Sequence, residues 1–218
     1  MHIMTEAISN FAVDIVDRRA EDPGNVALRW EKTGSAATEV TFLDLKIRSE
    51  KVAHVLHHHG VRPGHRVFIL LPACVAWWES VLGCMRVGAA AVLGQDASET
   101  QVLKDQIIQS RSSLVIATDT VAALVDPFRN DCTRVVHWLS VGWEREGWVD
   151  YDRRVSLAPS GLKTVETRGA DPCIVVYDEG TSITATTHFH GDETYGLAQL
   201  DAWRDGLAVA VQDASDLP

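Results

Sequence analysis

The sequence predicts an α/β fold in which a parallel sheet is flanked by helices. Residues 67–71, 89–93 and 114–117 are short and almost continuously apolar, which is the pattern of strands buried on both faces. Stretches with helical spacing separate these runs, and that alternation is typical of a parallel sheet with right-handed crossovers. The chain of 218 residues is long enough to enclose a substantial core.

Start and stop signals place several of the expected helices. The segment 22–24 (Asp-Pro-Gly) would end a first amphipathic helix, and Thr41 with Asp44 has the spacing of a capping box. The helix that starts there is expected to stop near Gly60, because glycine adopts the left-handed conformation that closes a helix. Ser98 has the side chain of a helix N-cap.

The expected elements follow one another without an internal repeat. In chain order, we expect a helix over 6–20, strands over 26–30 and 39–42 around a turn at 34–35, a helix to 59, a strand over 67–71, a helix over 73–87, a strand over 89–93, a helix over 98–110, a strand over 114–117, a short helix over 120–124, and strands over 135–138 and 173–177. Residues 140–170 are expected to be rich in loops, and a helix within 191–211 closes the fold.

Composition and charge indicate one acidic domain. We expect the domain to span residues 1–211 and a polar tail or linker to span 212–218. The net charge is −10, and an acidic surface argues against nucleic acid or an anionic membrane as a partner, because both require clustered Lys and Arg.

The cysteines and the N-terminus suggest a cytoplasmic location. Cys74, Cys84, Cys132 and Cys173 lie in apolar runs and form no CxxC pair, so buried free thiols in a reducing compartment are expected. The first residues lack the apolar core of a signal peptide, and no apolar stretch reaches the length of a membrane span.

The segment 176–190 carries the most specific information about function. Its Gly-Thr-Ser run at 180–182 resembles the middle of the ATP-phosphate loop of acyl-CoA synthetases and other adenylate-forming ligases. His188 and His190 match the end of that loop. The loop also follows an expected strand, over 173–177, as such a loop should.

Other segments resemble the same family in the same order, and some look like its medium-chain branch. They are Thr41-Phe42-x-Asp44-Leu45, Gly60-Val61-x-Pro63-Gly64, Leu71-Pro72 before Trp77-Trp78-Glu79, Gly147-Trp148-x-Asp150-Tyr151 and Asp171-Pro172. The resemblance implies the fold of the N-terminal subdomain of adenylate-forming ligases. It covers only the N-terminal portion of such a ligase, without the later motifs for adenine, ribose and metal.

The loop departs from the family pattern at the positions that would hold phosphate. Ile183 stands where a second glycine is expected, and its side chain would keep backbone N–H groups away from a phosphate. No lysine lies between Gly180 and His190 to supply a cation, and Asp178 and Glu179 add negative charge. The residues of this degenerate loop are Asp178, Glu179, Gly180, Thr181, Ser182, Ile183, Thr186, His188 and His190.

Other candidate sites are weaker. His188 and His190 are two potential zinc ligands without a third, so no metal site is expected. Four histidines near the end of the second expected helix, His54, His57, His58 and His59, read as a solvated helix end. Trp77 and Trp78 are adjacent, so one of them should pack inward while the other can lie at an interface.

The sequence therefore predicts a non-catalytic, truncated acyl-CoA-ligase-like domain with no catalytic residue and no cofactor. It would serve as a structural or protein-interaction module, with a protein partner or a second copy, for example at the N-terminus of a polyketide or fatty-acyl synthase. Two alternatives remain open. The chain could be half of a split acyl-CoA or acyl-carrier ligase, which would use ATP and magnesium, or it could bind an acyl group without adenylating it.

Overall fold

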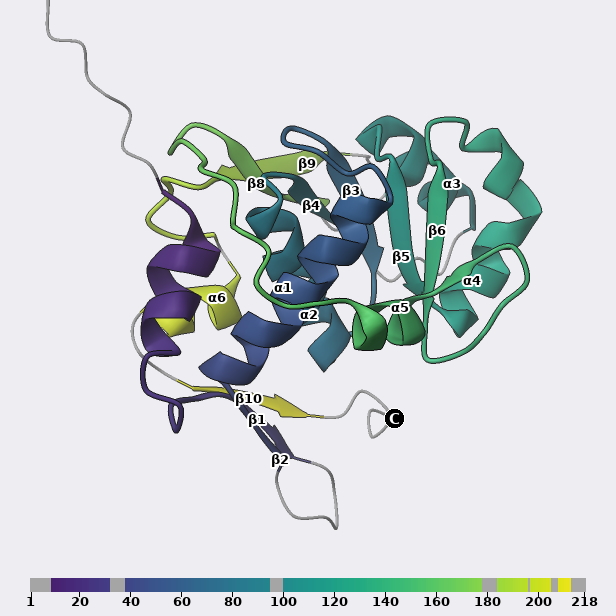
Figure 1. The fold of residues 1–218 in the computed structure, drawn as a ribbon. Helices are drawn as coiled ribbons and strands as arrows, with labels where there is room; N and C mark the ends of the chain where they lie inside the picture. Colours follow the sequence, from purple (N-terminus) through teal and green to yellow (C-terminus); the bar gives the residue numbers. More distant parts are fainter. Residues whose placement is uncertain are drawn as a thin grey trace, which may run out of the picture.

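The computed structural model describes residues 9–31, 38–94, 100–177, 184–195, 197–204 and 208–212. These residues form a seven-stranded sheet with the strand order β7-β6-β5-β3-β4-β8-β9 and a three-stranded sheet with the order β10-β1-β2 (Figure 1). The predicted α/β fold with a mostly parallel central sheet is confirmed.

The large sheet is parallel except at one edge. Its strands are β3 (Arg66–Leu70), β4 (Ala90–Leu93), β5 (Leu114–Thr118), β6 (His137–Val141), β7 (Val149–Asp150), β8 (Pro172–Tyr177) and β9 (Ala185–Phe189). Neighbouring strands run parallel, and only β9 runs antiparallel to its partner β8 among the pairings that the described residues make.

Helices cover both faces of this sheet (Figure 1). One face packs against α1 (Phe42–His58), α2 (Val75–Arg86) and α5 (Tyr151–Leu157), and the other against α3 (Thr100–Ser110), α4 (Asp119–Val125) and the 3₁₀ helix η2 (Asp126–Asp131). Alternate residues of β3 separate the two cores: Val67 and Ile69 belong to the first, whereas Phe68 and Leu70 belong to the second. This alternation follows from the two-residue period of a strand.

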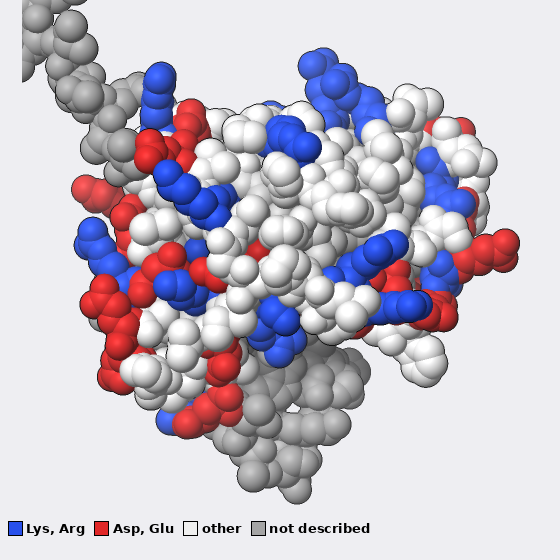
Figure 2. Space-filling model, viewed as in Figure 1, with Lys and Arg blue, Asp and Glu red and all other residues white. Residues whose placement is uncertain are grey.

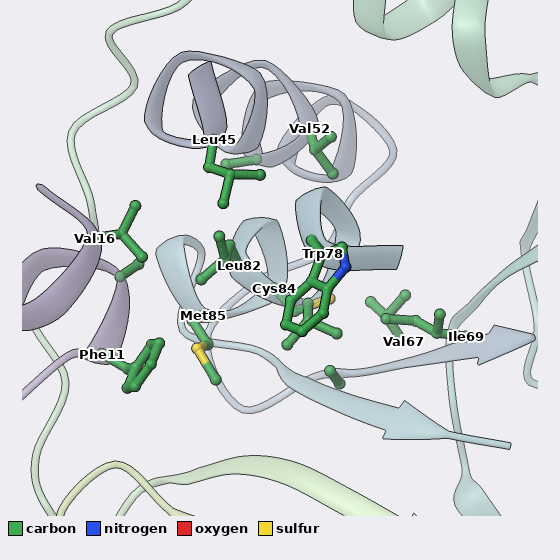
Figure 3. Packing of buried hydrophobic residues seen from close by; sticks show 14 of the residues in the cluster. Phe11, Val16, Leu45, Val52, Val67, Ile69, Trp78, Leu82, Cys84 and Met85 are labelled. Atoms are coloured by element: carbon green, nitrogen blue, oxygen red, sulfur yellow. The ribbon is translucent and has the colours of Figure 1, made fainter. Parts of the chain in front are cut away.

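The core of the first face is built around the crossing of α1 and α2. Figure 3 shows Leu45 and Val52 of α1 directed at α2, with Trp78 and Leu82 of α2 between α1 and the sheet. Gly83 of α2 allows the close approach, because an added Cβ there would lie 2.6 Å from Cγ1 of Val52. The predicted capping box starts α1: the backbone N–H groups of Thr41 and Asp44 each donate to the other residue's side chain, at 3.0 and 3.1 Å.

The small sheet joins the two ends of the described chain. It consists of β1 (Val26–Glu31), β2 (Thr38–Thr41) and β10 (Val209–Gln212), and it lies beside η1 (Ala12–Asp17) and α6 (Ala198–Arg204). Trp203 of α6 is fully buried, donates its indole N–H to the carbonyl of Ala27 at 2.9 Å, and packs 4.7 Å from the ring of Trp78.

In the second half of the chain, the structure departs in part from three sequence predictions. The strand predicted over 135–138 begins two residues later, at His137. The backbone N–H of Val135 donates to the carbonyl of Cys132 in a turn, and that of Val136 donates to the carbonyl of Ser113. The segment 140–170 contains β7 and α5, and Asp150 caps α5 by accepting the backbone N–H of Arg153 at 2.9 Å. The closing helix predicted within 191–211 is the short α6, followed by β10.

Other predictions differ from the structure in smaller ways. Phe42 begins α1 and does not end β2, and η1 has the wider turns of a π-helix over Ala12–Asp17. Ser98 lies outside the described residues.

All four cysteines are free thiols, of which Cys74 is half-buried and the other three are buried. None of the helices in the described ranges combines the length and the apolar character that a bilayer crossing requires.

Candidate functional site

The β8–β9 hairpin carries the segment that the sequence singles out. In this antiparallel pair, Tyr177 lies opposite Ala185, Val176 opposite Thr186, and Ile174 opposite His188. The six predicted site residues that connect the two strands are Asp178, Glu179, Gly180, Thr181, Ser182 and Ile183, and they lie outside the described residues. The structure therefore describes the two ends of the predicted loop.

Tyr177 fixes the first end of the segment. Its side chain is 4% exposed, its hydroxyl donates to the backbone carbonyl of Gln106 in α3 at 3.0 Å, and its ring lies 6.1 Å from that of Phe68. Burial raises the pKa of the Tyr177 phenol, so it stays neutral at physiological pH. Sequence reasoning treated Tyr177 only as the end of a strand. The sequence signal that could have indicated this anchor is a tyrosine hydroxyl at the end of an otherwise apolar strand.

The second end of the segment supplies hydroxyl groups but no cation. Thr184, Ala185 and Thr186 are exposed at the start of β9. Thr186 lies opposite Val176, whose side chain packs against the core of α1 and α2. A triphosphate needs Lys, Arg or closely spaced backbone N–H groups around it. The described residues at the two ends of the segment do not fit such a group.

His188 is half-buried on β9. Its Nδ1 lies 3.8 Å from a carboxylate oxygen of Asp192, and its ring meets that of Tyr195 edge-on at 6.2 Å between the ring centroids. Its backbone carbonyl accepts the thiol of Cys173 at 3.5 Å. These contacts hold β9 against β8 and against the residues that follow β9.

His190 is buried in the turn after β9. Its backbone N–H donates to the carbonyl of Asp171 at 3.1 Å, and its carbonyl accepts the hydroxyl of Ser9 at 3.1 Å. Its ring is 2% exposed, and neither ring nitrogen has a hydrogen-bond partner among the described residues. Burial lowers the pKa of His190 to about 4, an effect that Asp171 and Asp14 only partly offset. The imidazole is therefore neutral near pH 7 and supplies no positive charge to an anion.

The histidines do not form a metal centre in the described part of the chain. No group of three or more His, Cys, Asp or Glu side chains is placed there to hold a metal ion. Near the end of α1, His57 and His58 are exposed, as expected of a solvated helix end. His59 differs: its ring lies 4.6 Å from that of His137, and burial and then the neighbouring His137 lower its pKa to about 4.

A buried polar network, which sequence reasoning missed, joins the three helices of the first face. Glu79 of α2 is 1% exposed and forms an ion pair with Arg48 of α1. Tyr151 of α5 donates its hydroxyl to Glu79 at 3.4 Å and accepts the hydroxyl of Ser80 at 3.2 Å. Burial raises the pKa of Glu79, against the opposing effect of Arg48, and burial also raises the pKa of Tyr151. The partners within this network satisfy one another, which indicates a structural role.

Comparison with known proteins places the fold among ligases. Acyl-coenzyme A synthetase ACSM5, mitochondrial, of Rattus norvegicus is 27% identical over 212 residues, which cover 94% of this chain and 37% of that protein. Acyl-coenzyme A synthetase ACSM2, mitochondrial, of the same species is 29% identical over 216 residues, with 94% and 38% covered. The chain thus spans well under half the length of these curated relatives.

Solved structures share the fold. The anthranilate CoA ligase AuaEII in complex with anthranoyl-AMP has a TM-score of 0.83 and 19% identity, and the match covers 97% of this chain and 46% of that one. The acyl-CoA synthetase of Brucella canis has a TM-score of 0.73 and 23% identity over 84% of this chain and 33% of its own. A family model described as AMP-binding enzyme matches residues 16–182, which is more than half of the sequence. The resemblance predicted from the sequence is confirmed, and the chain belongs to the AMP-binding enzyme family.

Proposed function

We propose that this chain is a non-catalytic, acyl-CoA-ligase-like domain that serves as a structural or protein-interaction module. One observation carries the proposal: residues 178–190 contain no Lys or Arg, and Asp178 and Glu179 stand at their start. Neither end of the segment replaces the missing charge, because Tyr177 is buried against α3 and His190 is neutral.

The charge balance of this segment opposes phosphate chemistry. Catalysis of adenylation depends on positioning the phosphates and on cancelling the negative charge that develops on them. A carboxylate beside a polyanion raises the energy of the complex, and a cation removed from such a site typically costs about 2–4 kcal/mol. The strands at the two ends of the segment, β8 and β9, are nevertheless paired, which supports a role that depends on shape.

An exposed tryptophan supports a role in protein binding. Trp143 is 73% exposed in the loop after β6. Both neighbours of Trp143 contact α5: the backbone N–H of Gly142 donates to Asp152 at 2.6 Å, and Glu144 lies 3.8 Å from Arg153. A large apolar side chain held outward on a fixed loop is typical of an interface anchor. The partner we propose is a second copy of this chain or a domain of a polyketide or fatty-acyl synthase.

Two measurements test this proposal. ATP–pyrophosphate exchange with a panel of carboxylic acids is expected to stay at the background of a protein-free reaction, and exchange with any acid would contradict the non-catalytic role. Sedimentation equilibrium is expected to show self-association that Trp143→Ala weakens. Val136→Ala is the matched control, because Val136 is 69% exposed in the turn before β6. A chain that remains monomeric would remove the second copy as the partner.

The same assays address the two alternatives. Exchange that appears only after a separately expressed C-terminal ligase half is added would support a split ligase. Calorimetric binding of a carboxylic acid without exchange would support an acyl-binding module.

A further inference from the structure

A basic hollow opens at the amino-terminal edge of the large sheet. Its volume is about 550 Å³, within the range of small-molecule sites. The turn before β3, the end of α3 and the residues before β5 and β6 line it. Because β8 is parallel to β4, Tyr177 at the end of β8 lies at the opposite, carboxyl edge of the sheet. The hollow is therefore separate from the candidate site, and an inference about it does not depend on the proposed function.

Three arginines line the hollow without an acidic neighbour. Arg66, Arg111 and Arg134 are among its lining residues, and no Asp or Glu is found among the described residues that line it. None of the three forms an ion pair within the described part of the chain. By contrast, Arg145 pairs with both Asp119 and Asp126, at 2.7 and 2.8 Å.

This grouping is unusual for so acidic a chain. The sequence has 30 acidic and 20 basic residues, so an arginine has many possible partners. Figure 2 shows Lys and Arg side chains projecting from the rim above β3 and β5, whereas many of the acidic side chains on this face lie over η1. Like charges that share a concave surface repel one another, even where they are exposed as Arg111 and Arg134 are, and a bound anion relieves that repulsion.

The local structure holds two of the arginines in place. Among the described non-glycine residues, only Arg111 has a positive φ, of 55°. Buried hydroxyls fix its turn: the side-chain oxygens of Ser110 and Ser112 lie 2.8 Å apart, and the side-chain oxygen of Ser110 accepts the backbone N–H of Ser112 at 3.2 Å. Arg66 donates one N–H to the carbonyl of Ser110 at 3.1 Å, and its other guanidinium donors are available to a ligand.

We propose that this hollow binds a phosphoryl group, as a phosphate monoester or diphosphate, between Arg66, Arg111 and Arg134. A guanidinium presents a planar fork of donors that matches phosphate oxygens in a bidentate manner. A phosphate monoester carries a charge of roughly −1.5 to −2 at pH 7, which several arginines together neutralise. His65, Gln109 and Ser113 add polar groups to the same walls.

Pyrophosphate and vesicles test the site and identify the source of the phosphoryl group. In one arm, inorganic pyrophosphate is titrated calorimetrically into the whole chain at low salt. In the other, vesicles of phosphatidylcholine with and without phosphatidic acid are sedimented with it. Binding to pyrophosphate assigns a soluble ligand, and binding only to phosphatidic acid vesicles assigns a lipid headgroup. The absence of binding in both arms would overturn the proposal.

Matched variants show whether the arginines make the site. Arg111→Gln/Arg134→Gln is expected to weaken binding at least about tenfold, because it removes two charge-assisted contacts. The control Arg18→Gln/Arg154→Gln removes the same charge at exposed positions on other elements and is expected to leave the affinity unchanged. Equal affinity in the two double variants would refute the assignment, and a thermal unfolding scan checks that each variant is folded. If the chain binds ATP and Arg111→Gln/Arg134→Gln binds it equally well, the ATP occupies another site. That result would count against the proposed function and not against this hollow, so the two failures are distinguishable.

Discussion

Ile183 and Thr186 are the residues at which the missing phosphate chemistry can be tested most directly. The variant Ile183→Gly/Thr186→Lys removes the branched side chain and adds a cation opposite Val176 at the start of β9. We expect this variant to bind Mg·ATP at least about tenfold more tightly than the unmodified chain, because a charge-assisted contact is added. Calorimetry measures the difference, and Ile183→Gly/Thr186→Gln is the uncharged control. An equal affinity in all three proteins would mean that these two positions do not limit nucleotide binding.

His190 gives the stability of the fold a defined pH dependence. The pKa of His190 falls from 6.5 to about 4 on folding, so the folded state resists protonation that the unfolded chain accepts. Its contribution is fully present above pH 6.5 and is lost progressively as the pH falls toward 4. The loss is expected to reach about 2–3 kcal/mol.

Urea unfolding at pH 7.5 and pH 5 measures this effect. His190→Gln should reduce the difference in unfolding free energy between the two pH values, whereas His57→Gln, at an exposed position, should leave it unchanged. If the unfolding free energy of His190→Gln changes between the two pH values as much as that of the parent chain, His190 does not titrate as described.

At the scale of elements, the crossing of α1 and α2 depends on the absence of one side chain. Gly83→Ala would bring a methyl group to within 2.6 Å of Val52 Cγ1 and 3.3 Å of the backbone nitrogen of Ala53. We expect a loss of about 1–3 kcal/mol of unfolding free energy, because an overpacked interface must separate or strain. Gly24→Ala, where the nearest atom lies at 3.6 Å, is the control. Combining Gly83→Ala with Val52→Ala should recover part of the loss, and strictly additive effects would argue against a direct clash.

The elements that the sequence predicted well are those with local signals. The capping box at Thr41 started α1 as expected, and Gly60, with φ of 82°, ended it. By contrast, β6 begins at His137 and leaves Val136 exposed, because pairing with β5 selects which apolar residues form the strand. β10 was missed for the same reason, since only its pairing with the distant β1 makes it a strand.

The candidate site was predictable in its composition but not in its surroundings. The absence of a cation in 178–190 is visible in the sequence, and so is the position of the segment after a strand. The burial of His190 and the tether of Tyr177 to α3 depend on residues far away in the chain. The arginines of the basic hollow come from the first residue of β3 and from the segments before β5 and β6, which only the parallel sheet brings to one edge.

At the scale of the whole molecule, Trp203 connects the small sheet to the core of the large one. Its indole ring packs 4.7 Å from Trp78 and 5.5 Å from Phe42, and its N–H bonds to Ala27 of β1. We expect Trp203→Ala to cost about 3–5 kcal/mol, since a fully buried aromatic ring leaves a cavity. Thermal or denaturant unfolding measures this loss. Trp143→Ala, at an exposed tryptophan, should change stability by less than about 0.5 kcal/mol, and similar losses for both would contradict the packing described.

The pairing of β10 with β1 has a consequence for the order of events during synthesis. Val209 aligns with Leu28, so the upstream strand emerges from the ribosome long before its downstream neighbour exists. Until then, one side of β1 presents free amide and carbonyl groups, and the place of Trp203 beside Trp78 stays vacant. The nascent chain therefore exposes an unpaired strand edge until β10 has been synthesised, and pairing with β10 covers that edge.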